Sequence, residues 1–359
     1  MIQRPYTVLL LVPTGIGAAV GGYAGDALPV ARAIAQVADR LITHPNVLNG
    51  AQLYWPMPNA LYVEGYGLDQ FAAGRWTLRP VHQNRIGVIF DQAIEPELQL
   101  RHLQVMNAAR ATLGLNIADY VITDQPLGVS LRTSEQGASW GTIEQPDSLL
   151  RAAEQLIRLA GAQAIAVVAR FPDDADSVAL QQYRYGQGTD GLAGAEAVIS
   201  HLVVREFQVP CAHAPALTPL PLDPAVSPRA AAEELGYTFL PCVLVGLSRA
   251  PQFGSGLPEP GDVQASEVDA ILTPWSACGG GALLALANRP NLRVIAVSDN
   301  KTALQVPPEA LGIRAIKVQS YLEALGVLVA HRAGVEPTSL CPELTHLQPL
   351  VSSIAQVGA

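Results

Sequence analysis

Residues 38–45 read ADRLITHP, and the same pattern returns as ADYVITDQP at 118–126 and VDAILTPWS at 268–276. In each copy an acidic residue precedes two or three apolar residues, and a threonine then opens a polar loop. A short apolar run bounded in this way is typical of a buried strand. Because the carboxyl ends of parallel strands share one edge of a sheet, we expect the three loops to meet at a ligand-binding edge.

The composition narrows the classes of protein. The chain has 359 residues, which predicts two domains or one elaborated domain. Only 15% of the residues are charged and the mean hydropathy is +0.24, so we expect part of the surface to be buried in a homo-oligomer. The formal charge of −9, without a basic cluster, argues against nucleic-acid binding. Lysine occurs only at positions 301 and 317, which excludes a Walker-type phosphate loop before them.

Two features bear on location. The apolar run YTVLLLV at 6–12 is short and leads into a glycine-rich loop, so we interpret it as a first strand and expect neither a signal peptide nor a membrane span. The four cysteines form no CxxC pair, which predicts neither a disulfide framework nor a zinc site. We therefore expect a soluble cytoplasmic protein.

Apolar runs alternate with helix-like stretches along most of the chain. RIGVIF at 85–90 precedes the helical stretch 96–114, and AIAVVARF at 164–171 begins a further unit. This alternation predicts an α/β fold whose mainly parallel sheets are flanked by helices, in two similar halves with long proline-rich loops. We place an N-terminal half at 1–160, a C-terminal half at 161–335 and a tail at 336–359.

The stretch VPTGIGAAVGGYAGD at 12–26 follows the first strand. Glycines let a backbone approach a ligand closely, so we assign Thr14, Gly15 and Gly17 to an anion-binding loop. A structural turn and a nicotinamide site are the alternatives. The nicotinamide site is the weaker one, because the loop is long and the second strand lacks the acidic end of a Rossmann fold.

The loops after the first two copies of the strand motif carry further candidates. In the first, His44 is a candidate for proton transfer, and Asn46 and Asn49 for binding a carboxylate or carbonyl group. In the second, Thr123 and Asp124 extend the ligand-binding edge. The alternative is that the histidine and asparagines satisfy backbone groups of the loop.

The third loop, TPWSACGGGALLALA at 273–287, joins a strand to an alanine- and leucine-rich helix. Free amides and a helix dipole meet there, so we assign four of its residues to ligand binding: Ser276, Gly279, Gly280 and Gly281. A helix N-terminus lowers the pKa of a thiol, which makes Cys278 a candidate nucleophile or proton carrier. A small buried residue needed for packing would also suit this position.

Residues 209–216, VPCAHAPA, combine Cys211 with His213 at a strand end. The stretch resembles the CTHYP motif of glutamate racemases, which act on a carbon acid with two cysteines. ACGG at 277–280 approximates the paired motif of that family but stands in the opposite chain order. We therefore consider His213 a catalytic candidate.

Residues 297–304, VSDNKTAL, bring an acid, an amide and a cation to one loop. We expect Asp299 to orient a base or a metal ion, with Ser298 and Asn300 binding the ligand; an Asx turn is the alternative. Asp190, ahead of another predicted helix, suits a further anion site. No spacing specifies a metal or a cofactor.

Longer motifs carry a second resemblance. VPTGIGAAVGGYAGDALPVAR at 12–32, ITHPNVLNGA at 42–51, GAEAVISHL at 194–202 and TPWSACGGGALLALANRP at 273–290 are similar to a domain-of-unknown-function family of photosynthetic microbes, DUF3326. The similarity covers nearly the whole chain. It implies a conserved soluble protein and brings no activity or catalytic residue with it.

These patterns lead to one main function hypothesis and two alternatives. We expect an enzyme that acts on a small carboxylated or phosphorylated metabolite, bound in a crevice of strand-end glycine, threonine and asparagine loops. The first alternative is a thiol-dependent enzyme of the two-cysteine racemase type. The second is a non-catalytic sensor or assembly factor whose proline-rich arms bind a protein partner.

Overall fold

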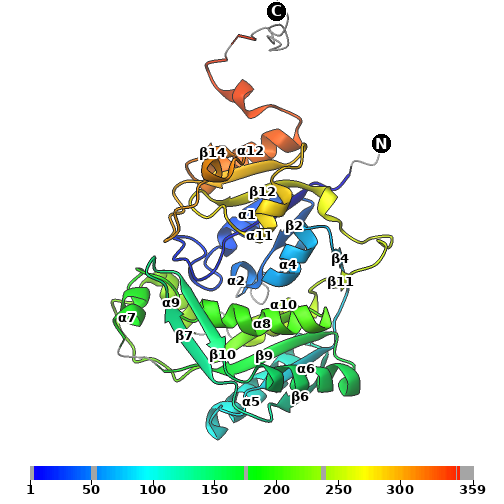
Figure 1. Ribbon diagram of the computed structural model, residues 1–359, viewed down its shortest axis with the longest axis vertical. Helices are drawn as coiled ribbons and strands as arrows, with labels where there is room; N and C mark the ends of the chain where they lie inside the picture. The colour runs from blue at the N-terminus through cyan, green and yellow to red at the C-terminus, as the bar shows by residue number, and fades with distance from the viewer. Residues whose placement is uncertain (1–3, 50–54, 174–176, 236–239, 345, 348–359) are drawn as a thin grey trace, which may run out of the picture.

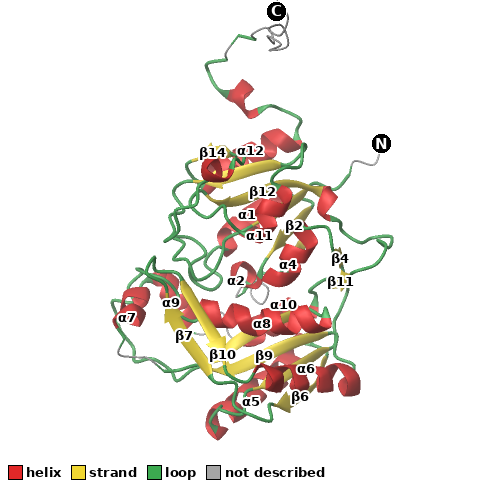
Figure 2. Cartoon of the chain, in the orientation of Figure 1, coloured by secondary structure: helices red, strands yellow, loops and turns green. Residues whose placement is uncertain are grey.

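The computed structural model describes residues 4–49, 55–173, 177–235, 240–344 and 346–347. Within them, two parallel β-sheets are each flanked by helices on both faces (Figures 1 and 2). The predicted α/β class is therefore confirmed.

The larger sheet has six strands in the order β14-β13-β12-β1-β2-β3, and every neighbouring pair is parallel. It combines strands from both ends of the described chain: β1 (Thr7–Leu10), β2 (Arg40–Thr43), β3 (Ala60–Tyr62), β12 (Val268–Pro274), β13 (Arg293–Val297) and β14 (Ile316–Val318). Strand β1 lies between β2 and β12, and its pairing with β12 joins residues about 260 positions apart in the sequence.

The smaller sheet has the order β10-β9-β5-β6, again with parallel pairs. Its strands come from the middle of the chain: β5 (Ile86–Phe90), β6 (Ile117–Ile122), β9 (Ala164–Arg170) and β10 (Cys211–Ala216). The division of the chain at residue 160 stays a prediction about domains. Each of the two sheets, however, contains strands from both sides of that residue.

The acidic residue of the repeated motif anchors backbone amides. The carboxylates of Asp39 and Asp269 accept hydrogen bonds of 2.8 Å from the amides of Tyr6 and Thr7, on either side of β1. The middle copy differs, because β6 is an edge strand and Asp119 accepts from the amide of Tyr120 in the same strand. The expectation that all three strands are buried is wrong for β6, in which Tyr120 and Ile122 are exposed.

Helices cover the six-stranded sheet on both sides. One side packs on α1 (Leu28–Val37) and α12 (Tyr321–Arg332), and the other on α4 (Gly65–Ala72) and α11 (Gly281–Leu286). The strand residues that point to the two sides alternate, as in Leu9 against Leu10, which is why these strands are apolar throughout.

The four-stranded sheet is covered in the same way, by α5 (Pro96–Leu113) and α10 (Leu240–Ser248) on one face and by α6 (Pro146–Ala160) and α8 (Ala193–Phe207) on the other. Helix α10 contacts the short α2 (Pro45–Leu48) of the other half. The apolar core therefore runs without a break from one sheet to the other.

Two adjacent crossings join the halves. Strand β4 (Thr77–Arg79) leaves the six-stranded half and pairs antiparallel with β11 (Gln252–Gly254), which returns to it. Buried Asn84 holds the two crossing segments together, because its side-chain amide donates to the carbonyls of Leu247 and Ala250 at 2.8 Å each.

Smaller elements complete the fold. A hairpin of β7 (Val129–Thr133) and β8 (Ser139–Ile143) packs on α8, and the helices α7 (Val178–Arg184) and α9 (Pro228–Glu234) form a small lobe beside it (Figure 1). The described residues also contain three short 3-10 helices: η1 (Ala265–Glu267), η2 (Pro308–Leu311) and η3 (Pro337–Leu340). The described part of the tail, from η3 onward, points away from the body of the molecule.

Candidate functional site

The glycine-rich loop, residues 11–27, joins β1 to α1 in the six-stranded half and contacts the four-stranded half. Its Gly15 carbonyl accepts from the amide of Ser139 at 2.8 Å, and its Tyr23 hydroxyl donates to the carbonyl of Tyr183 at 3.0 Å. It also bonds to residues 301 and 303 of its own half. We call the contact of this loop with the hairpin and the α7–α9 lobe the seam. Carboxyl-end loops of both sheets meet there, but the three loops of the repeated motif do not share one sheet edge, because β6 belongs to the four-stranded sheet.

Two glycines of this loop are needed for the close approach of the halves. Gly15 and Gly17 have φ angles of +70° and +59°, which side chains rarely adopt. A Cβ at Gly17 would lie 2.8 Å from Oγ1 of Thr189 and 2.9 Å from the carbonyl oxygen of Gly188. The structural role that the sequence left as an alternative therefore has direct support at these positions.

The chain's own carboxylates bind amides of the glycine-rich loop, although at residues other than the assigned Thr14, Gly15 and Gly17. Asp26 accepts from the amides of Gly21 and Tyr23 at 2.7 and 3.3 Å, and Glu233 accepts from the amide of Ala24 at 3.2 Å. Asp190 accepts from the amide of Leu192 at 2.8 Å, next to the start of α8.

The same holds at the third predicted loop. The carboxylate of Asp69, on α4, accepts from the amide of Ala282 in the first turn of α11, and a Cβ at Gly281 would lie 2.9 Å from it. Exposed Gly279 and Gly280 therefore stand beside an N-terminus that already has a negative partner. The anion predicted for this loop is replaced by a side chain.

Three carboxyl groups crowd together at the seam. Burial raises the pKa of Asp190 well above its ordinary value, and the charges of Glu233 and Glu196 raise it further. Burial, with Glu196 and Asp26 adding to it, raises the pKa of Glu233 to about 7, although the hydroxyl of Tyr183 donates to its Oε2 at 2.7 Å. Like charges in a poorly hydrated space cannot all ionise, so a proton is retained here at neutral pH.

Glu196 links this group to a histidine. Its Oε2 lies 3.5 Å from Nε2 of His213, and the Oγ of Ser200 lies 2.6 Å from Nδ1 of the same ring. Glu196 and Ser200 are one turn apart on α8, whereas His213 is on β10. Both ring nitrogens thus have partners that fix the ring, and the His213 and Glu196 side chains keep exposures of 20% and 15%.

Of the predicted catalytic residues, only His213 belongs to this group. His44 accepts a 3.2 Å hydrogen bond at Nε2 from the amide of Val12, and burial lowers its pKa to about 4, so it is neutral at pH 7. Asp299 is exposed, and its amide donates to the carbonyl of Gln319. Cys278 is buried, which raises its pKa to about 11 and corrects the predicted lowering; desolvation outweighs the six-residue helix behind it.

The predicted ligand-binding asparagines bind backbone and side chains of the protein. Asn46 donates to the carbonyl of Gly21 at 3.0 Å, and Asn49 accepts from the hydroxyl of Tyr62 at 2.9 Å. Asn300 accepts from the amide of Val20 and donates to its carbonyl. They hold the glycine-rich loop and its neighbours in place, which was the alternative reading of these residues.

The predicted hydroxyl residues behave in the same way. Ser276 lies 2.8 Å from the hydroxyl of Thr302, and Ser298 donates to the carbonyl of Val318. Thr14 is half-buried in the glycine-rich loop.

Thr123 and Asp124 belong to a separate place, at the end of β6. Thr123 donates to the carbonyl of Gln125, and Asp124 pairs with Arg151 and Ser148, which hold its pKa at about 2. In the second loop of the repeated motif, the predicted ligand-binding carboxylate of Asp124 thus forms a surface ion pair with Arg151.

Sequence reasoning missed Glu196, Ser200 and Glu233. The available signal for the first two was a glutamate and a serine at i and i+4 of a mainly apolar helix, ahead of the strand that carries His213. Glu233 carried no signal, because its burial depends on the fold of the α7–α9 lobe over the loop. No group of His, Cys, Asp and Glu in the part of the chain that the structure describes has the arrangement of a metal site.

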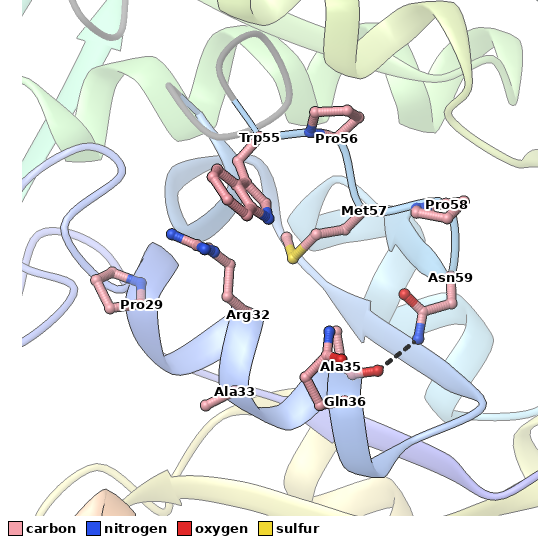
Figure 3. A pocket seen from close by; sticks show the side chains of 10 residues that line it. All are labelled: Pro29, Arg32, Ala33, Ala35, Gln36, Trp55, Pro56, Met57, Pro58 and Asn59. Atoms are coloured by element: carbon pink, nitrogen blue, oxygen red, sulfur yellow. Dashed lines mark hydrogen bonds between the residues drawn. The ribbon is translucent and has the colours of Figure 1, made fainter.

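A cavity of about 500 Å³ lies elsewhere, between α1 and the segment that leads into β3 (Figure 3). None of the predicted site residues lines it. Among the helices of the described residues, none has the length and apolar character to cross a membrane.

The comparisons with known proteins give a family and a relative. The family model described as protein of unknown function (DUF3326) matches residues 7–341. An uncharacterized lipoprotein of Synechococcus sp. (strain ATCC 27144 / PCC 6301 / SAUG 1402/1) is 60% identical over 357 residues, which are 99% of this chain and 99% of the relative. No solved structure matches. The expected cytoplasmic location is contradicted by this relative, which is named a lipoprotein.

The glycine-rich loop yields a prediction about stability. Gly17→Ala should lower the free energy of unfolding by about 2 kcal/mol, because the new Cβ meets Thr189 and Gly188 in a left-handed backbone conformation. The measurement is urea unfolding. Gly280→Ala is the matched control, since its Cβ would meet no atom within 4 Å; equal effects of the two changes would contradict the account.

The seam carboxyls yield a prediction about pH. The pKa of Glu233 rises from 4.5 to about 7 on folding, so its contribution to stability is complete below pH 4.5 and is lost as the pH rises toward 7. Relative to Glu233→Gln, the wild type should lose on the order of 2 kcal/mol across that window. Unfolding curves at several pH values measure it. Exposed Glu97→Gln should follow the wild type at every pH; a pH-independent difference for Glu233→Gln would refute the prediction.

Proposed function

The chain belongs to the DUF3326 family of proteins of unknown function, and we propose that it is an enzyme that transfers protons on a small polar metabolite held at the seam. The observation that supports the proposal is the pairing of a fixed, partly exposed His213 with Glu196, whose charge in turn raises the pKa of Asp190 and Glu233. Perturbed acids beside an oriented histidine are typical of sites of general acid and base catalysis.

Each residue has a distinct part in this proposal. His213 exchanges the proton with the substrate, since its ring keeps some exposure. Ser200 is 2% exposed and lies within α8, so it orients the ring and is no nucleophile. Glu196 stabilises the charged ring, and protonated Asp190 or Glu233 donates a hydrogen bond to the substrate.

The charge of the substrate is the point on which this proposal departs from the sequence-based hypothesis. A carboxylated or phosphorylated metabolite would meet Glu196, and loop amides that could offset its charge, those of Gly21 and Ala24, already bind carboxylates. The seam therefore favours a neutral or positively charged reacting group. The thiol alternative has little physical basis, because burial raises the pKa of both Cys211 and Cys278.

The proposal predicts proton exchange with solvent. In D2O, the full-length protein should convert at least one member of a mixture of small polar metabolites or add deuterium to its carbon, as seen by mass spectrometry. His213→Gln should reduce this rate about 100-fold, because one positioned proton carrier is lost. His82→Gln, on an exposed loop, is the control. An inert wild-type protein, or an equally active His213→Gln variant, would count against the proposal.

Self-association remains part of the proposal. Its support is the set of exposed leucines on α12 and the tail beyond it, where Leu322, Leu340 and Leu347 are 80%, 69% and 101% exposed. Light scattering should give a mass above the 37.9 kDa of one chain, whereas a monomer at all concentrations would exclude it.

A further inference from the structure

The cavity in Figure 3 has a single charged residue in its wall. Arg32, Gln36, Pro29 and Ala33 come from α1, and Trp55, Met57 and Asn59 come from the facing segment. Arg32 is half-buried, and no carboxylate within the described residues pairs with it. A guanidinium group in such a place keeps an unmet preference for an anion.

Arg32 and Trp55 form one binding surface. The guanidinium carbon lies 3.6 Å from the centre of the indole ring, with the ring stacked over it (Figure 3). Stacking uses the flat face of a guanidinium group, so its N–H groups remain directed outward in the plane. Trp55 is itself 53% exposed, which leaves its other surfaces available to a flat apolar group.

The wall opposite the helix is held in place without a ligand. The side-chain amide of Asn59 donates to the carbonyls of Ala35 and Ala38 at 2.8 and 3.0 Å, which fastens this segment to the end of α1. Met57 is buried and closes the floor, and prolines at 56 and 58 stiffen the segment between them. The cavity is therefore preformed, which reduces the entropy lost on binding.

From this geometry we propose that the cavity is a binding site for a small organic anion with a flat apolar body, a second site that shares no residue with the seam. The anionic group pairs with the edge of the Arg32 guanidinium, and the body packs on Trp55 and Met57. At about 500 Å³ the cavity has the size of a metabolite site. The wall of the cavity contains no acidic residue that would repel an anion.

The test uses anilinonaphthalene sulfonate, a flat aromatic anion that fluoresces when bound, and phenylnaphthylamine as its neutral counterpart. The full-length wild type should bind the anion at one saturable site. Arg32→Gln should weaken that binding at least about tenfold, whereas the neutral probe should be little affected. Trp55→Ala should weaken the binding of both probes.

Two further variants keep the test sharp. Arg32→Lys retains the charge but loses the planar stack, so its loss of affinity should be smaller than that of Arg32→Gln. Arg314→Gln, at an exposed position away from the cavity, should bind as the wild type does. The inference is overturned if Arg32→Gln and Trp55→Ala bind the anion as tightly as the wild type, or if Arg314→Gln loses as much affinity as they do. Neither result depends on proton transfer at the seam.

Discussion

Three carboxyl groups, those of Asp190, Glu196 and Glu233, share a space between the two halves in which they cannot all be charged. The proton that they retain lets the glycine-rich loop pack against the α7–α9 lobe without strong repulsion. It also leaves Glu196 close to His213, whose ring is held from α8. The closeness of the halves and the proposed chemistry thus depend on the same constraint.

Glycines and carboxylates of the seam together allow the two halves to lie close to each other. Gly15 and Gly17 allow the backbones to approach, and Asp26 and Glu233 bind the amides that this approach exposes. The features that resemble an anion-binding loop in the sequence are therefore largely satisfied within the protein. The cavity at Arg32 has the opposite character, with a cation that no carboxylate of the described residues neutralises.

The α/β class was predictable because buried parallel strands leave apolar runs such as YTVLLLV, and these are local features. Sheet membership was not, because β1 pairs with β12, whose residues are about 260 positions away. An apolar run also looks the same in an edge strand, which is why β6 was misjudged. At the site, His213 was identified from the stretch VPCAHAPA, which proves to be strand β10 itself and not the end of a strand. Its partners Glu196 and Ser200 lie on α8, and only tertiary contacts bring them to the ring. The pKa of Cys278 depended on burial, which outweighed the helix terminus visible in the sequence.

The most direct measurement follows the side-chain carboxyl carbons of Asp190 and Glu233 by NMR as the pH changes, with each signal assigned from an Asp190→Asn or Glu233→Gln variant. The account predicts that at least one of the two titrates near or above pH 7 and that removing one partner lowers the midpoint of the other. Midpoints close to the ordinary value of 4 for both groups, with no effect of either variant on the other, would contradict it.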